Sequence, residues 1–179
     1  MHLINNKSKF YFAIIIINLN IYLINMFAEY NYDNLPVVFV SFSENINSEN
    51  EFDQFLTEWL LLYHNGEDFS FIFDTRNMKN ISIKYAIKMT MFIKNLRKQP
   101  YHYLQKSLIL VNDKHIKRLL DFVFTLQSPV APVYLWHINS NDSELDKEYL
   151  ITTLNSINRV DLKDDMIYIK ANSSLIPFL

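Results

Sequence analysis

The chain has no cysteine and only one glycine, Gly66, among its 179 residues. The lack of cysteine excludes disulfides, thiolate zinc sites and a cysteine nucleophile. A dinucleotide-binding fingerprint, a phosphate-binding P-loop and the Gly-x-Ser-x-Gly elbow of serine hydrolases each require more than one glycine. Composition alone therefore excludes these classes of site.

The chain also lacks a strong charge of either sign, since its formal net charge is −2 at pH 7. Domains that bind nucleic acid usually carry a positive field, so we predict no nucleic-acid partner. We interpret two short basic groups as solvated helix faces. They consist of Lys94, Arg97 and Lys98, and of Lys114, Lys117 and Arg118.

The five histidines are scattered along the chain. None forms a pair at positions i and i+4, and no His-Glu-x-x-His arrangement is present. Because metal sites usually need such clusters, we predict no metal and no cofactor.

Half of the residues are hydrophobic, which is enough to bury a sizeable core in one domain. Short apolar runs at residues 69–73, 107–111 and 133–136 alternate with amphipathic helical patterns at residues 82–98 and 114–127. Strands separated by helices of this length indicate crossover connections. The central part of the chain therefore predicts an α/β fold, with a single mixed, mostly parallel sheet of four to five strands and alternating helices.

The segments before this central part extend the same pattern. Residues 37–42 are continuously apolar, as in a strand buried on both faces, and residues 27–35 predict a short edge strand. A helix with one apolar face then ends at Gly66, which suits the left-handed conformation that follows many helices. The predicted face consists of Phe52, Phe55, Leu56, Trp59, Leu60 and Tyr63.

The later segments complete the predicted fold. Apolar residues wrap most of the helix at 82–98, so we expect it to be largely buried. On the helix at 114–127, Phe122 and Leu126 fall off the buried face and form an exposed apolar pair. Ser143 and Asp146 resemble a weakened capping box for a last helix, whose buried side consists of Leu150, Leu154 and Ile157. Residues 166–170 predict a further short strand.

Three parts are distinguished along the chain: an apolar N-terminal segment at 1–25, a domain at 26–160 and a C-terminal tail at 161–179. Within the first part, an apolar run at residues 10–24 follows Lys7 and Lys9. It is consistent with a signal peptide or membrane anchor, with translated sequence upstream of a start at Met26, or with an extra element packed on the domain. We predict a cytoplasmic protein that associates with membranes only if residues 10–24 form an anchor.

The order of elements resembles the STAS domain, the family of bacterial anti-sigma-factor antagonists and of sulfate-transporter cytoplasmic domains. The resemblance covers residues 36–157, and its best matches are Phe71-Ile-Phe-Asp74 and Leu110-Val-Asn112. In the antagonists, a partner kinase phosphorylates a serine or threonine where the buried helix begins. The resemblance implies Ser82 as the phosphoacceptor. The Asp and Gly that flank this residue in the family are missing here, and a plain helix cap is the alternative.

A related fold, the CRAL-TRIO lipid-binding domain, fits residues 74–129 about as well. That family also has a strand that ends in Asp, a long helix and a strand that ends near Asn. It is usually longer on the N-terminal side and encloses an apolar ligand cavity.

These observations favour a non-enzymatic module that regulates or binds a protein partner. The predicted surface combines the turn at 74–82 with the exposed side of the helix at 114–127, and consists of Asp74, Thr75, Arg76, Asn77, Phe122 and Arg118. A CRAL-TRIO-like domain for a lipid or small apolar ligand is the alternative. A third hypothesis is a small hydrolase that uses Asp74, Asp113 and His137, because open α/β sheets bind ligands at the carboxyl ends of their strands.

Overall fold

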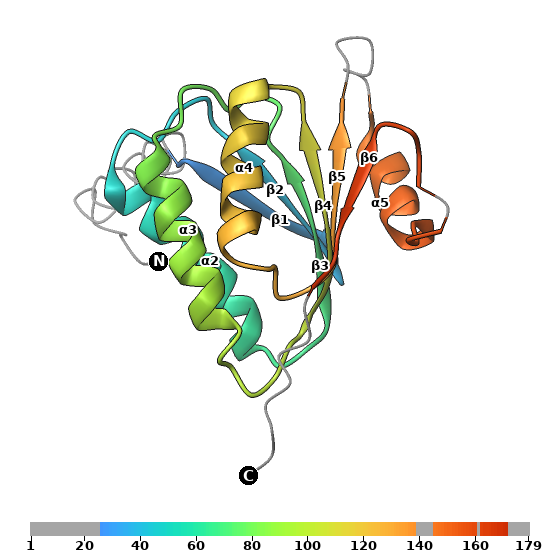
Figure 1. The fold of residues 1–179 in the computed structure, drawn as a ribbon. Helices are drawn as coiled ribbons and strands as arrows, with labels where there is room; N and C mark the ends of the chain where they lie inside the picture. Colours follow the sequence, from blue (N-terminus) through green and yellow to red (C-terminus); the bar gives the residue numbers. More distant parts are fainter. Residues whose placement is uncertain (1–25, 139–144, 161, 172–179) are drawn as a thin grey trace, which may run out of the picture.

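A computed structural model of the chain describes residues 26–138, 145–160 and 162–171. These residues form one six-stranded sheet whose strands lie side by side in the order of the sequence (Figure 1). The strands are β1 (Ala28–Asn34), β2 (Val37–Phe42), β3 (Phe69–Asp74), β4 (Leu104–Val111), β5 (Val133–His137) and β6 (Met166–Ile169). The helices are α2 (Glu49–His64), α3 (Ile83–Leu96), α4 (Lys114–Leu126) and α5 (Lys147–Ser156).

The sheet is mixed and mostly parallel. Strands β2 to β5 run parallel to one another, whereas β1 pairs with β2 and β6 pairs with β5 in the antiparallel direction. The predicted α/β fold with a single mixed sheet and alternating helices is confirmed. The predicted count of four to five strands is wrong, because both short edge strands join the sheet.

The strand order places three helices on the same side of the sheet. Parallel crossovers are almost always right-handed, so strands that follow one another in sequence send each connecting helix to the same face. Figure 1 shows α2, α3 and α4 on one face and α5 on the other. The strand order does not reverse within the described sheet, so it contains no topological switch point of the kind that binds ligands in doubly wound folds.

Strand β3 is the centre of the core because both of its faces are covered. Phe71 points to the helical side, where the Trp59 ring of α2 lies 4.8 Å from its centroid. Ile72 points to the other side and belongs to the cluster around Leu150 and Leu154 of α5. This double burial explains why the strand reads as a continuous apolar run.

The helices begin at side-chain caps. The hydroxyl of Ser48 accepts a hydrogen bond from the amide of Glu51, and Asp146 accepts one from the amide of Tyr149. Asp146 is thus the cap of α5 itself, whereas the predicted capping residue Ser143 lies outside the described residues. Gly66 follows α2 with φ +71, the left-handed conformation expected there.

Two predictions of burial are wrong. On α2, Leu62 is buried and Leu60 is exposed, so the buried side is rotated from the predicted face. Helix α3 is not largely buried, because Ile83 and Ile87 lie at the surface. Helix α3 lies between α2 and α4 and contacts both, but no described element covers its outer side. Periodicity locates apolar residues around a helix but does not show how many neighbours the helix has.

No helix of the described ranges is long and apolar enough to cross a membrane. The apolar run at residues 10–24, with its three interpretations, lies outside those ranges.

Alkaline pH is expected to destabilise the attachment of β1 to α2. The Tyr30 hydroxyl donates to the Phe55 carbonyl at 2.8 Å, and burial raises the Tyr30 pKa well above its ordinary value. Burial, followed by the Glu58 carboxylate, raises the pKa of Tyr32 to about 12. Unfolded tyrosines lose their protons near pH 10, so these two groups favour the folded state below that pH. The free energy of unfolding should therefore fall as the pH rises from 10 towards 12.

Urea unfolding followed by fluorescence at several pH values measures this loss. The Tyr30→Phe variant should show a weaker decline, while Tyr101→Phe, which alters an exposed ring, should behave like the wild type. A free energy of unfolding that stays constant in the wild type through this range would contradict the assignment.

Candidate functional site

The turn after β3 contains the residues that the sequence places at a partner-binding surface. The Arg76 guanidinium donates to both oxygens of the Asp74 carboxylate, from Nε to Oδ1 at 2.8 Å and from Nη2 to Oδ2 at 2.7 Å. The Arg76 amide donates to the same carboxylate at 3.1 Å. The side-chain hydrogen bonds to Asp74 raise the pKa of the Arg76 guanidinium. Asp74 and Arg76 therefore brace the turn, and each is only partly exposed.

Two further bonds tie this turn to the end of β4. The buried hydroxyl of Thr75 donates to the Leu110 carbonyl at 2.6 Å. The Asn112 side-chain amide donates to the Arg76 carbonyl at 3.2 Å. Of the four predicted turn residues, Asn77 alone has an exposed side chain, so the turn offers a partner less surface than the sequence suggests.

The three residues of the hydrolase hypothesis have structural partners. The Asp113 carboxylate accepts from the amides of His115 and Ile116 and begins α4. The Nδ1 atom of His137 lies 3.0 Å from the Val111 carbonyl, which can only accept, so Nδ1 carries the proton. Asp74 is held by Arg76, as described above.

No hydrogen bond joins any two of Asp74, Asp113 and His137 among the described residues. Nor does that part of the chain bring together three or more His, Asp or Glu side chains that could hold a metal ion. The bonds that Asp74, Asp113 and His137 make lie where strands end and a helix begins.

Ser82 lies at the start of α3, where the resemblance requires a phosphoacceptor. Its hydroxyl accepts from the Lys84 amide at 3.4 Å, and its side chain is exposed. The imidazole Nε2 of His115 contacts the carbonyl of the preceding residue, Ile81, at 2.9 Å. The first turn of α4 is therefore attached to the segment where α3 begins.

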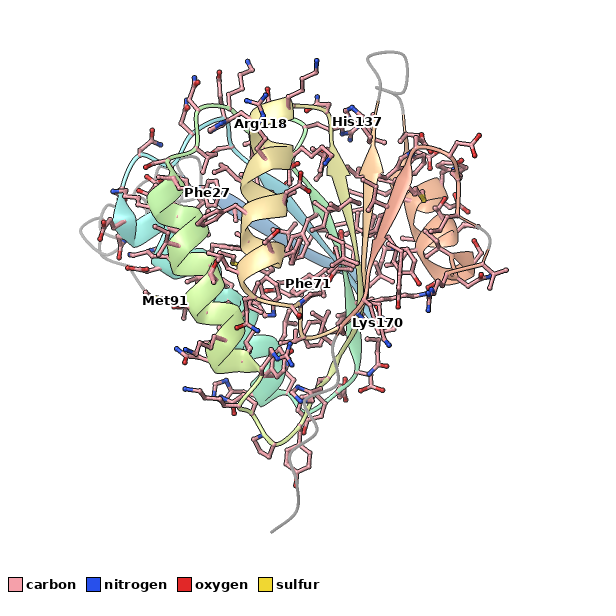
Figure 2. The ribbon with its side chains drawn as sticks, viewed as in Figure 1. Phe27, Phe71, Met91, Arg118, His137 and Lys170 are labelled. Atoms are coloured by element: carbon pink, nitrogen blue, oxygen red, sulfur yellow. The ribbon has the colours of Figure 1, made fainter. Side chains whose placement is uncertain are left out.

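The two predicted residues of α4 differ in exposure. Phe122 is half-buried, because it packs against Ala86 and Ile93 of α3, so the predicted exposed pair with Leu126 is wrong for Phe122. Leu126 itself is 58% exposed. Arg118 is exposed and has no ion pair among the described residues. Figure 2 shows Arg118 at the same end of the molecule as His137.

Three exposed apolar side chains lie on α3. Ile83, Ile87 and Met91 follow one another at intervals of four residues, which places them in one line along the helix. They are 49%, 42% and 61% exposed, respectively, and we call them the α3 stripe. Figure 2 shows Met91 pointing away from the sheet.

One side of the α3 stripe is bordered by ion pairs to α2. Lys84 pairs with Glu49 at 3.3 Å, and Lys88 pairs with Glu49 and with Asp53 at 3.4 and 3.1 Å. These bonds lower the pKa of Glu49 and raise those of both lysines. The sequence prediction missed the stripe because it treated the whole helix at 82–98, including Ile83 and Ile87, as largely buried. The spacing of these two residues with Met91 was the available signal.

An apolar cavity of about 140 Å³ lies between the sheet and the three helices α2, α3 and α4. Trp59, Met89 and Val123 line it from the helices, and Ser107 and Ala131 line it from β4 and the segment before β5. Every residue of the wall is buried or half-buried.

Comparisons with protein-family models, with curated proteins and with solved structures find no significant match to this chain. The resemblances to the STAS and CRAL-TRIO domains thus stay predictions from the order of elements and a few short motifs.

Substitution of Asp113 tests its role as the cap of α4. Asp113→Ala should lower the free energy of unfolding by about 1 kcal/mol, because α4 loses the acceptor for two amides. Asp113→Asn should stay within about 0.5 kcal/mol of the wild type, since asparagine caps as well as aspartate. Thermal or urea unfolding of the three proteins measures both values. A large loss in Asp113→Asn would show that the charge, rather than the cap, matters.

Proposed function

We propose that the chain is a non-enzymatic interaction module that binds a protein partner through the α3 stripe. The observation that carries this proposal is the line of Ile83, Ile87 and Met91 on the outer side of α3. Apolar residues repeated at this spacing are the usual anchors when one helix packs into the groove of another protein. An exposed apolar patch rimmed by polar groups is a common mark of an interface.

The charges around the α3 stripe indicate the chemistry of the partner. On the α2 side, Lys84 and Lys88 are already paired. Arg118 on α4 and Lys94 near the end of α3 are exposed and have no ion pair among the described residues. We therefore propose a partner that presents an apolar ridge with acidic residues on the side that meets α4. Opposite charges at such a rim mainly increase the association rate and specificity.

The order of elements supports a STAS-like regulatory role. The parallel strands follow one another in sequence, and Ser82 caps the second crossover helix, next to the α3 stripe. A phosphate on Ser82 would add negative charge where a helix N-terminus favours it, and would alter the charge that a partner meets. A cytoplasmic location is part of this proposal.

A CRAL-TRIO-like lipid-binding domain is the weaker alternative. Pockets for drug-sized ligands usually measure about 300–1,000 Å³. The cavity beneath the helices, at about 140 Å³, is smaller than that range. The volume supports the interaction module ahead of a domain that encloses a long-chain lipid.

A charge in the α3 stripe should weaken binding of the partner. Met91→Glu would bury an unpaired carboxylate in the apolar contact, which should lower affinity by about tenfold or more. A photoreactive phenylalanine analogue at position 91 should crosslink the partner in cells, and calorimetry with the purified partner then measures the affinity of each variant.

Leu61→Glu is the matched control, because Leu61 is an exposed apolar residue of α2 away from the α3 stripe. It should bind like the wild type. Equal affinities for Met91→Glu and Leu61→Glu would contradict the proposed surface. If crosslinks form only between copies of this chain, the partner at this surface is a second copy and the proposal of a different protein is wrong.

Substitution at Ser82 tests the proposed switch without removing the helix cap. Aspartate and asparagine both cap helices well, so Ser82→Asp adds a charge that Ser82→Asn does not. If phosphorylation regulates binding, Ser82→Asp should change the affinity for the crosslinked partner by about tenfold, and Ser82→Asn should not. Equal affinities for the two variants would argue that Ser82 is only a cap.

A further inference from the structure

We propose that the cavity beneath α3 binds a compact, uncharged apolar molecule, about the size of one or two fused aromatic rings. This site lies on the inner side of the helical layer and does not depend on the interaction surface proposed for its outer side. The proposal is based on the volume of the cavity, the chemistry of its wall and the segments that surround it.

The volume is the first argument. Native cores are packed as densely as organic crystals, and voids larger than a water molecule are few. The cavity, at about 140 Å³, is far larger than a void that would hold one water molecule. An apolar cavity of about 150 Å³ is known to stay dry and to take up benzene or xenon. A ligand of that size would restore the contacts that the wall lacks.

The wall defines the class of ligand. Its side chains come from every element of the helical layer and from the sheet, and none of those described carries a carboxylate, ammonium, guanidinium or imidazole group. An ion would lose its hydration there without a partner, so the ligand must be neutral. Water is disfavoured for a related reason, because a buried water needs several polar partners.

The few polar groups of the wall allow limited polarity in the ligand. Tyr85 and Ser107 are the wall residues that carry a hydroxyl group, and Ser107 is buried. The indole N–H of Trp59, a residue that also lines the cavity, has no hydrogen-bond partner within the described part of the chain. We therefore expect the ligand to be a ring compound with at most one hydrogen-bonding atom, such as an indole or a simple phenol.

Two loops that line the cavity offer the ligand a route inwards. Ile46 precedes α2 and Met78 precedes α3, and both are half-buried wall residues. The loops are joined by Lys79, whose amide donates to the Glu44 carbonyl at 2.7 Å and whose ammonium pairs with the Glu44 carboxylate at 3.1 Å. That ion pair is exposed, and loop segments held by exposed contacts can open without disturbing the sheet.

The methionines of the chain provide probes inside and outside the site. Met78 and Met89 line the cavity. Met91 is exposed on the same helix as Met89, and Met166 packs on the opposite face of the sheet. The experiment uses the full chain labelled with ¹³C at the methionine methyl groups. Benzene, indole and naphthalene are titrated separately, and palmitate tests for a long-chain lipid.

At least one of the ring compounds should shift the Met78 and Met89 methyl resonances in a saturable way, leave those of Met91 and Met166 in place, and raise the melting temperature. Palmitate should give no such pattern. Absence of shifts for all three ring compounds at their solubility limit would overturn the proposal. Equal shifts at all four methyl groups would also overturn it, because they indicate nonspecific association. Selective shifts with palmitate would show that the cavity takes a long-chain lipid, which contradicts the proposal of a compact ligand.

Filling the cavity tests its location. Ala131→Leu adds volume to the wall and should weaken binding of the ring compound by about tenfold or more. Ser107→Val is a second filling variant, used if the first does not fold. A folded filling variant that binds as tightly as the wild type would contradict the site. This outcome is separate from the crosslinking result at position 91, so either proposal can fail alone.

Discussion

The width of the helical layer is the constraint on which the rest of the structure depends. Neighbouring strands lie about 4.8 Å apart, whereas packed helices need 8–10 Å between their axes. Three successive crossovers on one face therefore make a layer wider than the strands that they connect. Helix α2 reaches outwards to contact β1, and α4 contacts β4, so α3 is left between them. The large aromatic side chains around Phe71 and Trp59 fill most of the space beneath.

Both functional proposals arise from the position of α3. Its inner residues Tyr85 and Met89 face the space that the aromatic rings leave unfilled, and its outer residues Ile87 and Met91 remain exposed. Each feature makes the folded state less stable when no ligand or partner is bound. A cavity loses dispersion contacts, and an apolar line in water is not stabilised by burial. Ligands on either side of the helix would remove these two costs independently.

The polar edge of the sheet shows why residue type is a weak guide to function. Asp74, Asp113 and His137 are the residue types used in hydrolysis, and they end neighbouring strands or begin a helix. In the structure Asp74 and Asp113 bond to groups of their own turns, and His137 bonds to a carbonyl of the neighbouring strand β4. In this fold class, parallel strands end together at one edge of the sheet. Carboxylates and imidazoles suit these positions because their hydrogen bonds hold the following loops in place.

The sequence by itself determined the class of fold, the approximate positions of the central strands and helices, and the capping role available to Ser82. These features depend on local periodicity and on side chains that bond their own backbone. Only the tertiary structure decided that Ile83 and Ile87 are exposed, that Phe122 packs against α3, and that a cavity lies beneath the helices. Exposure and packing depend on which elements lie next to one another. That arrangement follows from the strand order, the handedness of the crossovers and the mismatch in width, none of which is encoded in a local pattern.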